Sequence, residues 1–370
     1  MKILILGVAA VQYDAIKLLK SLGHEVHAIA RSRDGKGADV ANFFESIDFS
    51  DLEKVKEYIK EHDIDLVYSV GSDFAIPVSC KVSEELAMPK FVSEETARTC
   101  NNKGLLRKAL GRGFEGNVPF QVLSSIDEEL EVDYPFILKP SDSQGQRGIV
   151  LVNNYEDFVA NFSNTLSYSR SATVIIEKYI DGPEISVNGY MVDGKLVFCL
   201  SSDRETWEQY IGLIRRHVIP AKSISKLAEE KVKKIMERAA QKLGINNGPV
   251  YAQVKVEGDN PYIIEITPRL DGCHMWKLIK YSTGIDLLQT TFEHLLGIES
   301  EFTQFKTEYE VKPYNLRFVC QEPHTLADYS SEENNFTSAE ESFKYYDEGD
   351  EIRAVNGKYD KIAYLINGGN

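Results

Sequence analysis

Short apolar runs alternate with amphipathic segments through the first 95 residues, and this alternation restricts the fold more than any other feature of the chain. The apolar runs predict strands and the amphipathic segments predict helices. The six segments lie at 2–7, 12–23, 25–30, 50–62, 64–70 and 76–86. Strands joined by helices in this order imply a parallel, doubly wound sheet with right-handed crossovers. The first turn lacks the second and third glycines of a dinucleotide-binding loop, which argues against that role.

The remaining chain predicts mostly antiparallel strands with a few long helices. Asp193 and Gly194 form a typical hairpin turn, and a second hairpin is expected around Asp259. A long amphipathic helix is expected at 226–244, and the tail from residue 301 has short, aromatic-rich strands. A chain of 370 residues predicts two or three domains. We expect an α/β domain followed by α+β parts, divided as 1–95, 96–300 and 301–370.

The composition excludes several classes of function. The net charge of −15 argues against a general nucleic-acid-binding protein, which needs a basic face. No stretch approaches the ~18 apolar residues that cross a bilayer, and the apolar start of the chain predicts a strand instead of a signal peptide. Five scattered cysteines without a CxxC pair indicate reduced thiols. We therefore expect a cytoplasmic protein without a nucleic-acid or membrane partner.

A carboxylate stands inside an apolar run, at Glu265 in the segment 260–272. A lone charge on a buried strand is costly unless a cation compensates it. Successive side chains of a strand point to opposite faces, so Ile264 and Ile266 are expected in the core and Glu265 on the other face. The strand prediction therefore requires a cation near Glu265.

Three oxygen-bearing side chains are expected on the face of Glu265. A turn centred on Asp259 places Gln253 directly opposite Glu265, and Thr267 lies two residues further along the strand. Amide, carboxylate and hydroxyl oxygens suit Mg²⁺, which is commonly shared with substrate phosphates. Arg269, just past the strand, can face the same anion. The alternative is a solvated sheet face on which a carboxylate occurs by chance.

A second group of residues suggests nucleotide binding. The segment 141–148 is rich in serine, glutamine and glycine, and such a loop can present backbone N–H groups to phosphates. Lys139 ends the apolar strand before it, where a cation is costly unless it meets an anion. Glu177 ends another apolar strand, Glu184 follows a Gly-Pro turn, and backbone groups at 178–180 can pair with an adenine edge. The alternatives are solvated strand ends and an ordinary loop.

The order of these segments resembles the ATP-grasp superfamily, and within it the carboxylate–amine ligases related to carbamoyl phosphate synthase and biotin carboxylase. The matching elements are Lys103, FILKP at 136–140, the loop at 141–148, IIEKYIDGPEISV at 175–187, YAQVKV at 251–256 and IIEITPRLDG at 263–272. The resemblance covers nearly the whole chain. It implies a Rossmann-like domain before an ATP-grasp fold and a small β-rich C-terminal part.

The resemblance implies a set of nucleotide ligands. The lysines would hold the ATP phosphates, and the loop would cover them. Glu177 would accept a hydrogen bond from the adenine amino group beside backbone contacts, and Glu184 would bind the ribose hydroxyls. The full set is Lys103, Lys139, Ser141, Ser143, Gly145, Gln146, Glu177, Lys178, Tyr179, Ile180 and Glu184.

The resemblance also implies a metal site and a catalytic arginine. Gln253, Glu265 and Thr267 would bind Mg²⁺, with Mn²⁺ as an alternative cation. The family usually has asparagine at the position of Thr267 and often an acid at that of Gln253, so this chain supplies less negative charge, and the second of two metal positions is in doubt. Arg269 would stabilise the phosphoryl group in transit.

The pocket for the substrates is expected where the strand ends of the first domain face the phosphate site. Arginines suit a carboxylate, and His217 would be catalytic by orienting the acid or taking a proton. The candidate substrate-binding residues are Gly71, Ser72, Asp73, Arg215, Arg216, Asp271, Gly272 and His274. The alternative for the segment around His217 is an exposed basic strand with a packed histidine.

Together these features predict a ligase that uses ATP and Mg²⁺ to activate a carboxylate as an acyl phosphate. The acyl group would then be joined to an amine, and ADP and phosphate would be released. The partners would be a small-molecule acid and amine, and the family implies a homodimer. Two alternatives are a carboxylase that forms carboxyphosphate and an inactive nucleotide-binding module.

Overall fold

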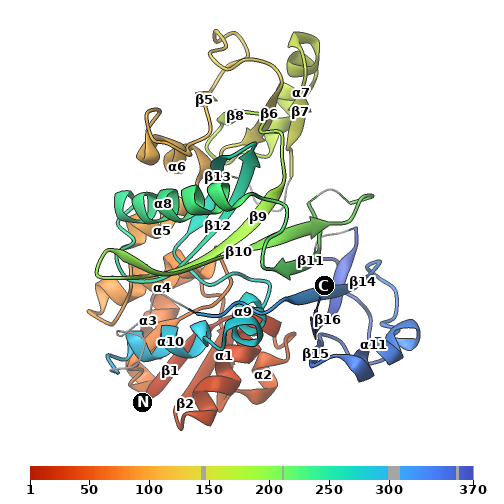
Figure 1. The fold of residues 1–370 in the computed structure, drawn as a ribbon. Helices are drawn as coiled ribbons and strands as arrows, with labels where there is room; N and C mark the ends of the chain where they lie inside the picture. The colour runs from red at the N-terminus through yellow and green to blue at the C-terminus, as the bar shows by residue number, and fades with distance from the viewer. Residues whose placement is uncertain (143–146, 211, 299–308, 356–357, 370) are drawn as a thin grey trace.

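The computed structural model describes residues 1–142, 147–210, 212–298, 309–355 and 358–369. These residues form three sheets. In Figure 1 the N-terminal sheet lies at the bottom, a small sheet lies at the top, and a large sheet lies between them and continues to the right. None of the described helices is long and apolar enough to cross a membrane.

The N-terminal sheet confirms the parallel arrangement expected from the alternating pattern. Its strands pair in parallel in the order β3-β2-β1-β4. Side chains on the two faces of β1 pack into separate core clusters, Ile3 and Ile5 in one and Leu4 and Leu6 in the other, which explains its uninterrupted apolar run. The elements are β1 (Lys2–Leu6), α1 (Ala10–Ser21), β2 (Glu25–Ala30), α2 (Gly37–Val40), β3 (Phe43–Ser46), α3 (Leu52–His62), β4 (Leu66–Tyr68) and α4 (Ala75–Glu85).

A small antiparallel sheet follows, with the strand order β5-β8-β6-β7. Helix α7 covers one of its faces, where Phe158 packs with Phe136 and Ile176. Glu177 is adjacent to Ile176 in β8 and therefore points to the opposite face. The elements are α5 (Glu94–Asn101), α6 (Lys103–Leu110), β5 (Phe120–Leu123), β6 (Phe136–Pro140), β7 (Val150–Val152), α7 (Tyr155–Ser167) and β8 (Val174–Lys178).

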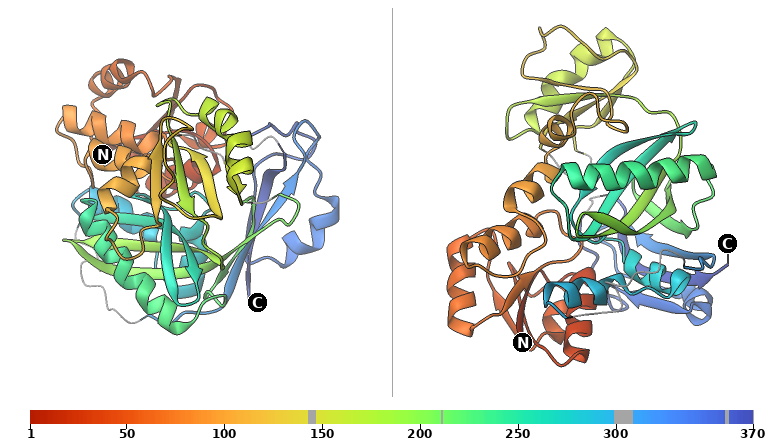
Figure 2. Two further views of the ribbon diagram at one scale, coloured as in Figure 1. Left: turned by 90° about the horizontal axis from the view of Figure 1, so that it is seen from above. Right: turned by 60° about the vertical axis from the view of Figure 1, so that its left-hand side comes forward.

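The large sheet is antiparallel and has the strand order β13-β12-β9-β10-β11-β14-β16-β15. Figures 1 and 2 show helix α8 lying across one of its faces. The elements are β9 (Glu184–Val192), β10 (Lys195–Thr206), β11 (Ile214–Ile219), α8 (Lys226–Lys242), β12 (Gly248–Glu257), β13 (Asn260–Thr267), α9 (Met275–Thr283), α10 (Leu287–Leu295), β14 (Tyr314–Gln321), α11 (Glu333–Ser338), β15 (Glu341–Lys344) and β16 (Asp360–Gly368).

The aromatic-rich tail adds strands to this same sheet. Strand β14 pairs with β11, and β16 then pairs with β14. The tail is therefore β-rich, as expected, and it continues the sheet of the preceding segment. The division of the chain at residues 95 and 300 stays a prediction.

The expected hairpin of β12 and β13 contains a bulge. Gln253 pairs with Glu265, as predicted, but Val254 pairs with Ile263, so Ile264 has no partner residue. The prediction that Ile264 points into the core was wrong. Ile263 is fully buried in its place, and Ile264 is only partly buried. The bulge inserts one residue and so shifts the alternation of side chains before Glu265.

Two glycines make the contact between the first domain and the segment after β13. Gly71 lies beyond the end of β4 with a φ of +64°, and a Cβ atom there would lie 2.8 Å from Cα of Gly272. A Cβ on Gly272 would in turn lie 2.9 Å from the carbonyl oxygen of Gly71. The two backbones therefore approach at a distance that only glycine permits.

Replacing Gly71 should destabilise the protein through both backbone strain and this close approach. Gly23 offers a control, since its φ is +84° but a Cβ there would meet nothing within 4 Å. We expect Gly71→Ala to lower the free energy of unfolding by about 3 kcal/mol and Gly23→Ala by about 1 kcal/mol. Chemical denaturation of the two variants checks this, and equal losses would show that the contact with Gly272 is not rigid.

Candidate active site

One face of the large sheet is polar across its central strands. Residues paired across neighbouring strands share a face, so the register identifies them. The pairs are Gln253 with Glu265, Ser186 with Gln253, Ser202 with Ser186, Tyr251 with Thr267, and Arg204 with His217. Helix α8 packs on the other face, against apolar residues. The polar face therefore brings the predicted metal-binding residues and His217 to one side of the sheet.

The predicted metal-binding residues lie at the β12–β13 end of this face. Gln253 donates its Nε2–H to Oε1 of Glu184, which leaves its amide oxygen available as an acceptor. The Glu265 side chain is 48% exposed, and its Oε1 lies 3.8 Å from Nζ of Lys103. The amide oxygen of Gln253 and the solvent-exposed carboxylate of Glu265 are thus neighbours, and Lys103 lies near them.

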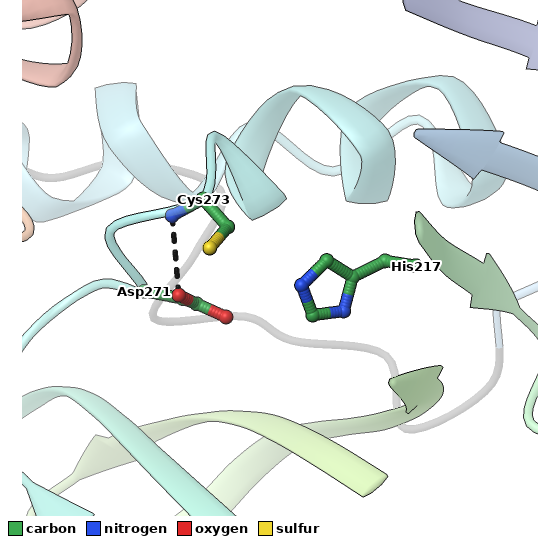
Figure 3. A group of neighbouring side chains, drawn as sticks. All are labelled: His217, Asp271 and Cys273. Carbon is green, nitrogen blue, oxygen red and sulfur yellow. Dashed lines mark hydrogen bonds between the residues drawn. The ribbon is translucent and has the colours of Figure 1, made fainter. Parts of the chain in front are cut away.

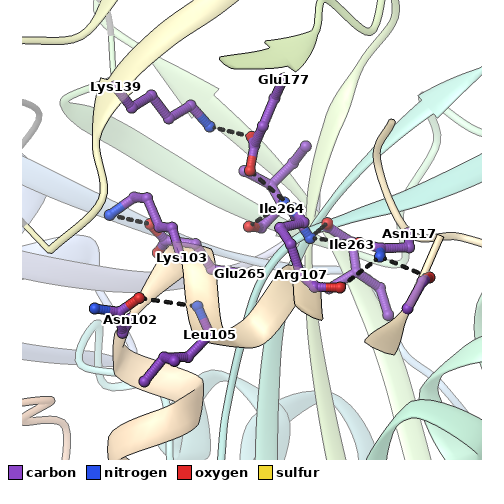
Figure 4. A network of polar contacts seen from close by, with 11 residues as sticks. Asn102, Lys103, Leu105, Arg107, Asn117, Lys139, Glu177, Ile263, Ile264 and Glu265 are labelled. Carbon is purple, nitrogen blue, oxygen red and sulfur yellow. Dashed lines mark hydrogen bonds and ion pairs between the residues drawn. The ribbon is translucent and has the colours of Figure 1, made fainter. Parts of the chain in front are cut away.

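A buried ionic network lies next to these residues (Figure 4). The guanidinium of Arg107 donates to Oε1 of Glu177 at 2.7 Å, and Lys139 Nζ donates to the other carboxylate oxygen at 2.6 Å. Arg107 also donates to the carbonyl oxygens of Ile263 at 2.7 Å and Ile264 at 2.9 Å. These carbonyls lie at the bulge, so Arg107 connects α6, β8 and β13.

Arg107 was not among the residues singled out from the sequence. It is fully buried, and it occupies the inward face of α6 with Gly104, Leu106 and Leu110. An arginine within such a stripe needs a buried anion, because an unpaired charge there is costly. The apolar spacing of this helix in the sequence, with Arg107 on its buried face, was the signal that could have identified Arg107.

The network holds Glu177 in its charged form. Burial alone would raise the pKa of the Glu177 carboxyl, but Arg107 and Lys139 together lower it to about 2. Both carboxylate oxygens are used inside the protein. The predicted contact of Glu177 with the adenine amino group stays a prediction.

The remaining nucleotide candidates lie around this network. Ser141 is buried and accepts a hydrogen bond from Thr173 at 3.0 Å, and its carbonyl accepts from the backbone N–H of Lys103 at 3.1 Å. The beginning of the predicted phosphate loop is thereby attached to the start of α6. Ser143, Gly145 and Gln146 lie outside the described residues.

The expected hinge at 178–180 is held by lysine contacts. Lys178 pairs with Glu257 at 2.8 Å. Lys255 donates to the carbonyl oxygen of Ile180 at 2.8 Å, and its ammonium lies 5.0 Å from the ring centre of Tyr179. Glu184, at the start of β9, also pairs with Arg204. The four predicted hinge and ribose residues therefore adjoin the β12 end of the polar face.

Arg269 forms a two-pronged ion pair with Asp73 of the first domain. Its Nε lies 2.5 Å from Oδ1 and its Nη2 lies 2.7 Å from Oδ2, while Thr267 donates to Oδ1 at 3.3 Å. Burial opposes the ionisation of Asp73, but Arg269 outweighs it and holds the pKa of the carboxyl below its ordinary value. A residue predicted to bind substrate and a residue predicted to be catalytic thus contact each other directly.

The other predicted substrate residues lie in four places. Gly71 packs on Gly272, and the Ser72 hydroxyl accepts from the N–H of Ala75 at 3.2 Å at the start of α4. Arg215 and Arg216 both pair with Glu205. His274 contacts Asp14 at 2.7 Å. Asp271 lies beside His217.

The charge of Glu177 should contribute to stability above its ordinary pKa of 4.5 and lose that contribution as the pH falls toward 2. We expect Glu177→Gln to lower the free energy of unfolding by roughly 3 kcal/mol at pH 7, since it leaves two buried cations with one fewer anion. The difference from wild type should shrink between about pH 5 and pH 2.

Urea unfolding at several pH values measures this difference. The exposed Glu61 on α3 provides a control, and Glu61→Gln should change the stability by less than about 0.5 kcal/mol. A loss in Glu177→Gln that stays constant from pH 7 to pH 2 would show that the carboxylate charge does not stabilise the fold.

Comparisons with known proteins identify the fold of the chain and a domain family within it. Residues 132–276 match the ATP-grasp domain family. A formate-dependent phosphoribosylglycinamide formyltransferase of Mycolicibacterium smegmatis is 23% identical over 283 residues, which are 72% of this chain and 69% of that protein. An alanine–anticapsin ligase of Bacillus amyloliquefaciens is 22% identical over 324 residues, 77% of this chain and 68% of that protein.

A solved structure shows the same fold over the whole chain. It is the biotin carboxylase domain dimer of 2-oxoglutarate carboxylase from Hydrogenobacter thermophilus, in complex with MgADP, ADP and bicarbonate. The match has a TM-score of 0.82 at 16% identity and covers 100% of this chain and 86% of that one. These findings confirm the resemblance drawn from the sequence motifs. Residues 132–276 thus match the ATP-grasp domain family, and the whole chain has the fold of that solved structure.

Proposed function

We propose that this protein is a ligase that uses ATP and Mg²⁺ to activate a carboxylic acid as an acyl phosphate and then joins it to an amine. The observation that carries the proposal is the polar face where Gln253 lies opposite Glu265, with Lys103 3.8 Å from Glu265. The alanine–anticapsin ligase among the relatives supports ligation as the type of reaction. ADP and phosphate would be the other products.

The nucleotide would lie between the small sheet and the polar face of the large sheet. Lys103 and Lys139 come from α6 and β6 and would contact its phosphates, a role suited to ammonium groups near the oxygen ligands of a metal. Glu177 would keep Lys139 in place through the 2.6 Å contact. The hinge at 178–180 and Glu184 would receive the adenosine part.

The oxygen atoms at the β12–β13 end fit a magnesium ion. Glu265 would supply a carboxylate, Gln253 an amide oxygen, and Thr267 a hydroxyl, a small set of hard ligands that leaves positions for water and phosphate oxygens. The ion would neutralise charge on the phosphates during transfer. Mn²⁺ as a substitute remains a prediction.

The chain would act on the reaction mainly by positioning and charge. Arg269 would stabilise negative charge on the phosphoryl group, while its contact with Asp73 fixes the guanidinium on the side of the first domain. His217 would stand at the far end of the polar face, toward the substrates. A homodimer and a cytoplasmic location also remain predictions.

A carboxylase that forms carboxyphosphate is the second candidate. The observation that favours it is the likeness in fold to the biotin carboxylase domain, which was solved with bicarbonate. Carboxyphosphate formation also releases ADP, so ADP alone does not separate the two reactions. Dependence on bicarbonate does, because the proposed ligase needs a different acid.

Hydroxylamine trapping tests the proposal. We expect a hydroxamate to form from ATP, Mg²⁺ and one member of a panel of carboxylic acids without any amine substrate, together with ADP and phosphate. AMP and pyrophosphate as products would exclude the acyl phosphate. Turnover that requires bicarbonate and no other acid would favour the carboxylase.

Two carboxylate variants connect this assay to the proposed metal site. Glu265→Gln should lower the rate roughly 100-fold or more, because the loss of a metal ligand removes several kcal/mol of charge stabilisation. Glu230→Gln, on the exposed surface of α8 across the sheet, should retain the wild-type rate. Equal rates in the two variants would contradict a metal role for Glu265.

A further inference from the structure

Three buried side chains converge beyond the proposed nucleotide site (Figure 3). One ligating atom from each of His217, Asp271 and Cys273 lies within 4.8 Å of the others. His217 comes from β11, and the other two come from the segment after β13. Asp271 and Cys273 follow Arg269 closely in the sequence. Asp271 was predicted to bind substrate and His217 to be catalytic, but the ligand that this cluster holds was not specified.

Several polar atoms at this cluster have no hydrogen-bond partner among the described residues. They are Nε2 of His217, Oδ2 of Asp271 and Nε of Arg204. His217 is fully buried and Asp271 is 4% exposed. Buried polar atoms are nearly always paired, so these unpaired atoms are suited to contact a polar ligand or ordered water. Figure 3 shows the imidazole of His217 directed toward Asp271 and Cys273.

The charges around the cluster oppose a metal ion. Lys361 Nζ lies 3.4 Å from Sγ of Cys273 and 3.6 Å from the ring centre of Phe318. Burial, with the positive charges of Arg204 and Lys361, holds the pKa of His217 well below its ordinary value. Two cations beside the three candidate ligands would repel a metal cation, and they would attract an anionic group.

The groups at the cluster include donors and an acceptor. Arg204 offers its unpaired Nε–H, and Lys361 offers an ammonium that contacts the thiol of Cys273 and the ring of Phe318. Together these two donors suit a carboxylate. Asp271 offers a carboxylate oxygen, which suits an ammonium group. Asp271 is also only two residues from Arg269, so an ammonium bound there would be near the proposed phosphoryl group. The arrangement therefore fits a small molecule with both charges, oriented with its amine toward the reaction.

We propose that this cluster binds the amine substrate and that this substrate is an α-amino acid. Its ammonium group contacts Asp271, and its carboxylate contacts Arg204 and Lys361. The assignment as the amine substrate rests on the ligase function proposed above. Cys273 lines the site without a charged contact to the ligand, so its thiol is not required.

Calorimetry of the full-length protein tests this site directly. Each of the twenty common L-amino acids is titrated in the presence of MgADP, and at least one is expected to bind. Its analogues without the α-carboxylate or without the α-amino group should each bind at least about 10-fold more weakly, the scale of a lost charge-assisted contact. Absence of binding by all twenty amino acids, with MgADP still bound, would overturn the proposal.

Substitutions identify the residues that recognise the ligand. Asp271→Asn and Lys361→Met should each weaken amino-acid binding at least about 10-fold, whereas Cys273→Ser should leave it unchanged. MgADP binding should be the same in all three variants, which shows that they are folded. Wild-type amino-acid affinity in both Asp271→Asn and Lys361→Met would contradict the assignment.

A titration with Zn²⁺ alone tests the alternative that the cluster binds a metal ion. Tight zinc binding that is lost in Cys273→Ser would replace the amino-acid site with a metal site. Failure of the ligase proposal has a different signature, since the amino acid would then bind at Asp271 but no hydroxamate would form from any acid.

Discussion

The buried guanidinium of Arg107 connects the parts of the chain on which the proposed site depends. It pairs with Glu177 of the small sheet and donates to the two carbonyl oxygens at the bulge in β13. The bulge immediately precedes Glu265, and Glu177 holds Lys139. Without Arg107 these carbonyls would lose their side-chain donor and Glu177 would keep one cation. Arg107 thus supports the positions of both Lys139, proposed to bind phosphate, and Glu265, proposed to bind the metal.

The polar face of the large sheet shows how charge is distributed between the proposed functions. At the β12–β13 end, Glu265 and Gln253 supply oxygen atoms near Lys103. At the β10–β11 end, Arg204 and His217 have unpaired nitrogen atoms. In the proposed reaction, Arg269 acts on the phosphoryl group that passes from the nucleotide to the substrate. Asp73 of the N-terminal segment pairs with Arg269. The first domain therefore contributes to the site, although its first turn does not resemble a dinucleotide-binding loop.

The sequence was sufficient for features that depend on local spacing. The alternation in residues 1–95 predicted the parallel sheet. A turn centred on Asp259 predicted Gln253 opposite Glu265. That pair exists, but the turn has the two residues Gly258 and Asp259, and the bulge at Ile264 is what brings Glu265 opposite Gln253. The bulge at Ile264 was not predicted from local spacing, and the side chain that bonds its carbonyl oxygens, Arg107, is distant in sequence. The contact of Asp73 with Arg269 likewise joins residues that are far apart in the sequence. The pairing of Arg215 and Arg216 with Glu205 requires the register of β10 and β11, which no turn motif revealed.

The most direct test of acyl phosphate formation follows oxygen atoms within ATP. ATP labelled with ¹⁸O in the β,γ-bridge is incubated with the protein, Mg²⁺ and the acid substrate, in the absence of the amine. Reversible transfer of the γ-phosphoryl group to the acid would let the β-phosphate of ADP rotate and move the label to non-bridging positions. We expect this exchange to require the acid. Amide formation without any such exchange, or exchange at the α,β-bridge, would contradict the mechanism.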